Sequence, residues 1–212
     1  MPETPRPVLV IACGALAREI VALKARYGWQ HLHLTCLNAR LHNSPAAIPD
    51  RLRQAIRRHR AGYEDIFVAY ADCGTGGGID RVLEEEGAAR LEGAHCYEFY
   101  AGAARFAALS SEEPGTFYLT DFLARHFERL VIEPLGLGRH PELRDAYFGN
   151  YRRLVYLSQV PDAALVERAR RAAARLGLEF AHSRCGYGGL ESGLATFIGR
   201  TGHGPQNSRL LA

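Results

Sequence analysis

The stretch VLVIACGALAREIVALKARY, residues 8–27, decides the fold class. It begins with six apolar residues, Val8–Cys13, which is a length typical of a buried strand. After Gly14, apolar residues recur at helical spacing, so Ala15–Tyr27 is expected to be a helix. A buried strand that runs directly into a helix is the first half of a βαβ unit, and repeated units of this kind imply a parallel sheet.

The same alternation continues through most of the chain. Further strands are expected at His31–Leu37, Asp65–Ala71, Arg90–Cys96, Thr116–Thr120, Arg153–Ser158 and Leu178–His182. Helices are expected at Ile48–Arg60, Ile79–Glu86, Ala103–Ser110, Asp121–Leu130, Pro141–Tyr151 and Ala163–Leu176. The sequence therefore predicts an α/β fold: a single domain over residues 1–198, with a mostly parallel sheet flanked by helices in three layers, and a loose tail over 199–212.

Composition narrows the class of protein. Hydrophobic residues make up 47% of the 212 residues and charged residues 23%, which is typical of a globular domain with a full core. A net charge of +3 is too small to indicate nucleic-acid binding, and the basic stretch at 51–60 is explained as the exposed side of a helix. No apolar run approaches the roughly 20 residues of a membrane span, and no signal-peptide pattern is seen, so a cytoplasmic protein with reduced cysteines is expected.

Cysteines follow the expected strands. Cys13, Cys73 and Cys96 come at or just after strand ends, Cys185 follows the last strand, and only Cys36 lies inside one. Ligands of open parallel sheets bind beyond the carboxyl ends of the strands. We therefore expect thiols that are far apart in the sequence to converge at this edge.

The densest motif is YADCGTGGG, residues 70–78, where a strand runs into glycines and then a helix. Glycines let a backbone approach a ligand closely, and amides at a helix start attract anions. The loop Gly74, Thr75, Gly76, Gly77 and Gly78 is therefore a candidate binding site for a small anionic substrate. A tight turn is the structural alternative, but it needs only one or two glycines.

Four further residues complete a candidate metal site with Cys73. Thiolate and imidazole ligands favour zinc, with iron as the alternative. Cys96 and His95 are adjacent on an expected strand, where successive side chains point to opposite faces. Only one of them can therefore face the site, and Cys96 is the preferred ligand with His95 as the alternative. His42 follows the second strand, and Cys13 opens a helix, whose dipole would lower the pKa of its thiol.

Several of these motifs together resemble the bacterial and archaeal family called domain of unknown function 1638. The resemblance covers nearly the whole chain and rests on Ile11–Leu16, Leu41–Pro45, Tyr70–Gly77, His95–Gly102, Gly115–Phe122 and Phe148–Tyr151. It implies an association with corrinoid-dependent methyl-transfer systems, and therefore a corrinoid or a methyltransferase protein as partner in one-carbon metabolism.

Three functions remain open from the sequence. The first is a metal-dependent transferase in which zinc, held by Cys73, Cys96 and His42 (or Cys13) with one position left open, activates a thiol or water. The second is a non-catalytic module that binds a small anion or a corrinoid cofactor. The third is thiol redox chemistry between Cys13, Cys73 or Cys96, which would have to meet in space because no Cys-x-x-Cys motif is present.

Overall fold

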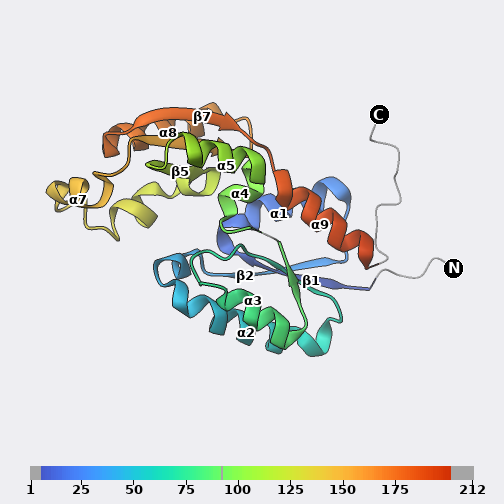
Figure 1. Cartoon of the computed structure of the whole chain (residues 1–212). Helices are drawn as coiled ribbons and strands as arrows, with labels where there is room; N and C mark the ends of the chain where they lie inside the picture. Colours follow the sequence, from blue (N-terminus) through green and yellow to red (C-terminus); the bar gives the residue numbers. More distant parts are fainter. Residues whose placement is uncertain (1–5, 92, 202–212) are drawn as a thin grey trace. The chain divides into compact units, whose positions relative to one another are not determined.

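The computed structural model describes residues 6–91 and 93–201, which form two compact units, each built on its own parallel sheet (Figure 1). The first unit contains the chain up to Cys96 and the segment that begins at Gly189, and the second contains Tyr97–Gly188. The first sheet has the order β2-β1-β3-β4, from Leu32–Leu37, Val8–Cys13, Ile66–Ala69 and Ala89–Arg90. The second has the order β5-β6-β7, from Thr116–Thr120, Arg153–Ser158 and Glu179–Arg184. The predicted α/β class with parallel strands is confirmed, and the strands fall into two sheets where one was expected.

Helices cover both faces of the first sheet. In Figure 1, α1 (Ala17–Tyr27) and α9 (Gly188–Arg200) lie on one face, and α2 (Ile48–His59) and α3 (Gly78–Glu86) lie on the other. Short 3-10 helices connect them: η1 (Gly14–Leu16), η2 (Ala39–Asn43), η3 (Pro45–Ala47) and η4 (Arg60–Gly62). Both β1 and β3 are buried throughout, as expected for central strands covered by two helical layers.

Helix α9 brings the end of the chain back to the first unit, which the sequence did not predict. Leu190, Leu194 and Ile198 are fully buried, and the ring of Phe197 stacks on Phe67 of β3 with 4.7 Å between centroids. The tail that was expected to be loose from residue 199 is helical as far as Arg200, and its residues 202–212 lie outside the described part of the chain.

The expected strand Arg90–Cys96 was wrong beyond its first residue. Strand β4 ends at Arg90, the chain bends through Gly93 with φ +138°, and α4 (Cys96–Ala101) begins at Cys96. The Arg90 side chain donates to the carbonyl groups of Leu91 at 2.6 Å and Gly93 at 3.3 Å. These side-chain bonds satisfy carbonyl groups that a longer strand would have paired with a neighbouring strand.

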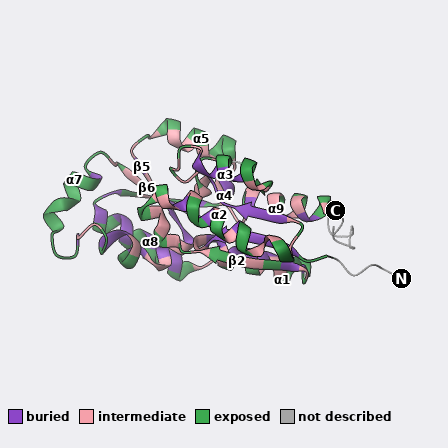
Figure 2. Cartoon of the chain, turned by 90° about the horizontal axis from the view of Figure 1, so that it is seen from below, coloured by how far each residue is buried: buried purple, intermediate pink, exposed green. Residues whose placement is uncertain are grey.

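The helices of the second unit are α5 (Ala103–Glu112), α6 (Asp121–Arg125), the π-helical turn η5 (Glu128–Ile132), η6 (Pro141–Leu143), α7 (Arg144–Phe148) and α8 (Ala163–Leu176). Helix α8 has the predicted bounds, with Asp162 as its N-cap and Gly177 in the left-handed conformation at its end. The helix expected over Asp121–Leu130 is divided, because α6 ends at Arg125. Almost all of α7 is exposed (Figure 2). No described helix of either unit is long and apolar enough to cross a bilayer.

A buried aspartate joins the carboxyl ends of two strands in the second unit. Asp121 is fully buried and accepts hydrogen bonds from the Tyr156 hydroxyl at 2.6 Å and from the amides of Gln159 and Val160, both at 3.1 Å. The Gln159 side chain in turn accepts from the Asp121 amide at 2.8 Å. This mutual bonding gives the carboxylate the partners that a buried charge requires.

Candidate thiol and imidazole site at the switch point of the first sheet

The order of the first sheet creates a topological switch point between β1 and β3. The chain passes from β1 to β2 on one side and then crosses to β3 on the other side of β1. Loops after β1 and β3 therefore diverge, and ligands of such sheets bind in the crevice that they leave. The residues that end or follow these strands are Cys13, on β1, and the segment that starts at Tyr70, after β3.

Cys13 lies at this switch point, but its thiol is more deeply buried than the sequence suggested. It is 3% exposed, and its sulfur accepts a hydrogen bond from the Ala15 amide at 3.4 Å. Burial raises the pKa of Cys13 and outweighs the lowering effects of the Ala15 amide and the Tyr70 hydroxyl. The prediction that the helix start would lower this pKa was therefore wrong, because desolvation dominates over the dipole of one short 3-10 turn.

His42 reaches the same edge from η2, the turn that follows β2. Its Nδ1 is 3.0 Å from the Ala39 carbonyl oxygen and 3.9 Å from the Cys13 sulfur. A carbonyl can only accept, so Nδ1 carries the hydrogen and Nε2 is the basic nitrogen. Burial lowers the pKa of His42, but the interaction with Cys73 and the hydrogen bond to the Ala39 carbonyl together outweigh burial and raise it. The Cys73 thiol therefore lies close enough to the His42 imidazole to influence its charge.

Cys73 occupies a strained backbone position. With φ at +51°, it is the only residue other than glycine with a positive φ in the described part of the chain. Left-handed conformations cost a side chain on the order of 1 kcal/mol or more, and such strain is found most often at functional sites. The backbone is fixed by hydrogen bonds from the Asp72 amide to the Gly93 carbonyl at 3.1 Å and from the Cys73 amide to the Ala94 carbonyl at 3.0 Å. The segment after β4 thus fixes the position from which the thiol projects.

The glycine loop is organised around the carboxylate of Asp72. This carboxylate accepts from the Thr75 hydroxyl at 2.7 Å and from the amides of Gly77 at 2.8 Å and Gly76 at 3.2 Å. Burial raises the pKa of Asp72, but these bonds and one from the Gly74 amide outweigh it and hold the pKa below its usual value. The amides of Thr75 and Gly78 are also used within the loop, by the Asp72 and Thr75 carbonyl groups. An internal carboxylate thus takes the place of the expected anion, and binding of a ligand to Gly74–Gly78 stays a prediction.

Tyr70 packs against His42 and belongs to the site. The sequence did not indicate this, because Tyr70 resembles an ordinary strand side chain. Its ring is 1% exposed and stacks on the His42 ring with 6.2 Å between centroids. The hydroxyl finds no hydrogen bond of ordinary geometry among the described residues. Burial raises the pKa of Tyr70, and the neighbouring Cys13, Cys73 and Cys36 thiols raise it further. Cysteines from three different strands or loops therefore influence the charge of one buried phenol group.

The other cysteines are placed differently. Cys36 lies inside the edge strand β2, as expected, and partial desolvation together with the Cys13 thiol raises its pKa to about 11. Cys96, with His95 before it, opens α4 instead of ending a strand, two residues after the Ala94 carbonyl that binds the Cys73 amide. Cys185 belongs to the second unit, where its amide donates to the Ser158 carbonyl at 3.0 Å.

Over residues 6–91 and 93–201, no group of three or more His, Cys, Asp or Glu side chains is already spaced to hold a metal ion. Cys13, His42 and Cys73 are brought together as predicted, but as pairwise contacts that meet at the His42 ring.

A cationic group that the sequence reading missed lies beside the glycine loop. Arg81, in the first turns of α3, holds its guanidinium 4.0 Å from where a Cβ on Gly77 would lie and 3.7 Å from one on Gly78. It is exposed and makes no ion pair with any residue that the structure describes. Its position three residues after Gly78, in the helix that follows the glycine loop, could have indicated that its side chain lies near the loop.

One of three comparisons with known proteins gives a match. The family model described as "Protein of unknown function (DUF1638)" matches residues 36–194, a range that includes His42, Tyr70 and Cys73. No curated protein and no solved structure matches the chain. Because the family model covers well over half of the sequence, the chain belongs to the DUF1638 family.

Proposed function

We propose that the chain is a thiol-dependent transferase that carries a group on Cys73, with His42 as the general base. The observation that carries the proposal is the proximity of the His42 imidazole to the Cys73 thiol at the switch point of a parallel sheet. A nucleophile, a base within hydrogen-bond reach and a third group that orients the base are the features of covalent catalysis by cysteine. The Ala39 carbonyl is the orienting group, because it holds His42 Nδ1–H at 3.0 Å.

The chemistry follows from these positions. The Cys73 thiol gives its proton to the basic nitrogen of His42 and its sulfur attacks an acyl carbon, so that an S–C bond forms. The bond from that carbon to the leaving group then breaks, and the leaving group takes the proton from His42. Water or a second acceptor cleaves the thioester and restores the thiol. Strain at Cys73 supports this role because it fixes the sulfur at the end of a strand–turn–helix motif.

Arg81 supports a small anionic substrate. Its guanidinium is unpaired among the described residues and lies over the glycines that follow Cys73. Guanidinium groups pair bidentately with carboxylates and phosphates. The anionic end of the substrate would therefore bind Arg81, because the loop amides already serve Asp72.

The experiment uses two activated phenyl esters, one of acetic acid and one of succinic acid, whose free end carries a carboxylate. Cys73 is expected to be acylated by both, with release of one phenol per chain before steady turnover, and mass spectrometry is expected to place the acyl group on Cys73. Arg81→Gln is expected to reduce acylation by the succinyl ester only, and Cys36→Ser is the matched thiol control. Acylation that persists in Cys73→Ser would reject the proposal.

A second candidate is a zinc site made by Cys13, His42 and Cys73, with Cys96 or His95 as a further ligand. The Cys13 sulfur lies 3.9 Å from the His42 ring, so a thiol and an imidazole whose Nε2 is free to bind a metal are already neighbours, which favours it. When bound, zinc would lower the pKa of a substrate thiol. Methyl transfer with a corrinoid partner belongs to this candidate, since a methyl group bound to cysteine sulfur is difficult to pass on. Elemental analysis of untagged protein tests it: about one zinc per chain, lost in Cys13→Ser and Cys73→Ser, would favour zinc over the covalent route.

A further inference from the structure

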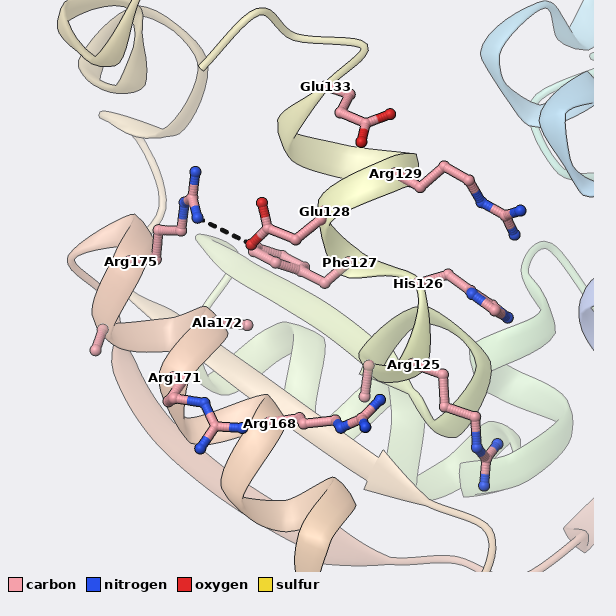
Figure 3. Close-up of a pocket in the computed structure, with 12 residues that line it drawn as sticks. Arg125, His126, Phe127, Glu128, Arg129, Glu133, Arg168, Arg171, Ala172 and Arg175 are labelled. Atoms are coloured by element: carbon pink, nitrogen blue, oxygen red, sulfur yellow. Dashed lines mark hydrogen bonds and ion pairs between the residues drawn. The ribbon is translucent and has the colours of Figure 1, made fainter. Parts of the chain in front are cut away.

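A groove rich in arginine lies wholly within the second unit, away in sequence from every residue of the thiol site (Figure 3). One wall is α6 with the segment that leads into η5, and the other wall is α8. The groove encloses about 740 Å³, which is within the range of small-molecule sites, roughly 300–1,000 Å³. Its lining includes Arg125, Arg129, Arg168, Arg171 and Arg175.

The groove carries a large excess of positive charge. Five arginines face two glutamates, Glu128 and Glu133, so the groove has about as much excess charge as the whole chain, whose net charge is +3. Glu128 is already paired with Arg175 at 2.9 Å, across the two walls, as the dashed line in Figure 3 shows. Arg129 and Arg168 make no ion pair or hydrogen bond with any residue in the described ranges. The groove therefore has guanidinium groups that are available to a ligand.

The spacing of the arginines indicates an extended anion. Arg168, Arg171 and Arg175 are three and four residues apart on α8, so they form one row of roughly 10 Å along the helix axis. One phosphate or carboxylate group cannot reach all three, whereas a chain of phosphates can. Arginine is also the side chain that matches phosphate oxygens bidentately.

The rest of the lining argues against a nucleic acid. Proteins that bind single strands offer exposed aromatic rings on which bases stack. The only phenyl ring in the lining belongs to Phe127, and it is 6% exposed because it packs in the core of the unit. The other aromatic group in the lining, the His126 imidazole, is half-buried and packs edge-on against Phe122 with 4.8 Å between centroids. The lining therefore presents arginines rather than a platform of exposed rings.

We infer that the groove binds a small molecule with two or more linked phosphate groups. Arg168 and Arg129 supply the unpaired charges, one on each wall. Arg171, 3.7 Å from Glu167, and Arg125, 3.8 Å from Asp121, add further guanidinium groups. Binding of this ligand is independent of the reaction at Cys73.

The test is calorimetric titration of the full chain with sodium tripolyphosphate, pyrophosphate and orthophosphate in the presence of a chelator. Affinity is expected to fall in that order, and to fall as salt is raised. Arg168→Gln and Arg129→Gln are each expected to weaken tripolyphosphate binding about tenfold, as expected for the loss of a charge-assisted hydrogen bond. Glu133→Gln is expected to strengthen it about threefold, because a like charge is removed from the groove.

The matched control is Arg58→Gln, which should leave the affinity unchanged. Arg58 is an exposed arginine of α2 in the first unit, and it makes no ion pair within residues 6–91 and 93–201. Thermal unfolding of each variant shows that it is folded. The inference is overturned if tripolyphosphate shows no saturable binding, or if Arg168→Gln and Arg129→Gln bind it as the parent does. It is also overturned if an oligothymidylate or a polyglutamate peptide of equal charge binds more tightly than tripolyphosphate.

Discussion

The His42 imidazole lies close to the Cys73 thiol although one residue follows β2 and the other follows β3. They meet because β1 lies between those two strands, so that both loops leave the same edge of the sheet on either side of Cys13. The left-handed backbone conformation of Cys73 fixes its thiol, and the hydrogen bond to the Ala39 carbonyl fixes the His42 ring.

Relief of the strain at Cys73 gives a first prediction. Cys73→Gly is expected to be more stable than Cys73→Ala by about 1 kcal/mol, because glycine adopts a positive φ without a steric cost. Both variants lack the thiol, so this comparison isolates the backbone. Equal free energies of unfolding in urea for the two variants would show that position 73 is not strained.

Asp72 gives a prediction that depends on pH. Its pKa is lowered in the folded state, so its contribution to stability is present above the unfolded pKa of about 4 and is lost as pH falls through the folded pKa. Asp72→Asn is expected to lose about 1–2 kcal/mol at pH 7, a value reduced by partial exposure to solvent. The difference from the parent should shrink below about pH 4. A difference that stays constant from pH 7 to pH 3 would contradict the account of the loop.

Tyr70 gives a prediction of the opposite sign. Its hydroxyl is buried without an ordinary hydrogen bond among the described residues, so Tyr70→Phe is expected to be neutral or to stabilise by up to about 1 kcal/mol. Calorimetric unfolding measures this directly. A loss of more than about 1 kcal/mol would mean that the hydroxyl makes a favourable bond, most simply to the Cys13 thiol.

The stability of the second unit depends on the buried carboxylate of Asp121. Asp121→Asn places an amide group where the Tyr156 hydroxyl and two backbone amides now donate, so at least one donor loses its acceptor. The expected loss in the free energy of unfolding is about 2–4 kcal/mol. Asp162→Asn is the matched control, because asparagine also serves as an N-cap and should cost only a few tenths of a kcal/mol. Similar losses in both variants would contradict a special role for Asp121.

Helices and strands could be predicted where the apolar residues follow one clear pattern. The strand Val8–Cys13 and the helix Ala163–Leu176 have the predicted bounds, because a wholly apolar run and a three-to-four spacing with clear caps each allow one local structure. β4 was not predictable, because the side chain of Arg90, through bonds to carbonyl groups, and the bend at Gly93 end it. α9 had a signal in Leu190, Leu194 and Ile198, but the glycines that precede them resembled a loop.

The location of the site could be predicted from the sequence, but its chemistry could not. Parallel topology alone implies that Cys13, His42 and Cys73 gather at one edge, and they do. The sequence could not show how deeply Cys13 is buried, so the direction of its pKa shift was wrong. It also could not show that Asp72 uses the loop amides, since that depends on the left-handed turn at Cys73 and Gly74.

Activation of Cys73 by His42 is measured by the rate of alkylation at each cysteine. Iodoacetamide labelling at pH 7, resolved by mass spectrometry, should modify Cys73 faster than Cys36, whose pKa of about 11 leaves little thiolate. His42→Gln should slow labelling of Cys73 by about tenfold and leave Cys36 unchanged. Labelling of Cys73 at the same rate with and without His42 would contradict the account.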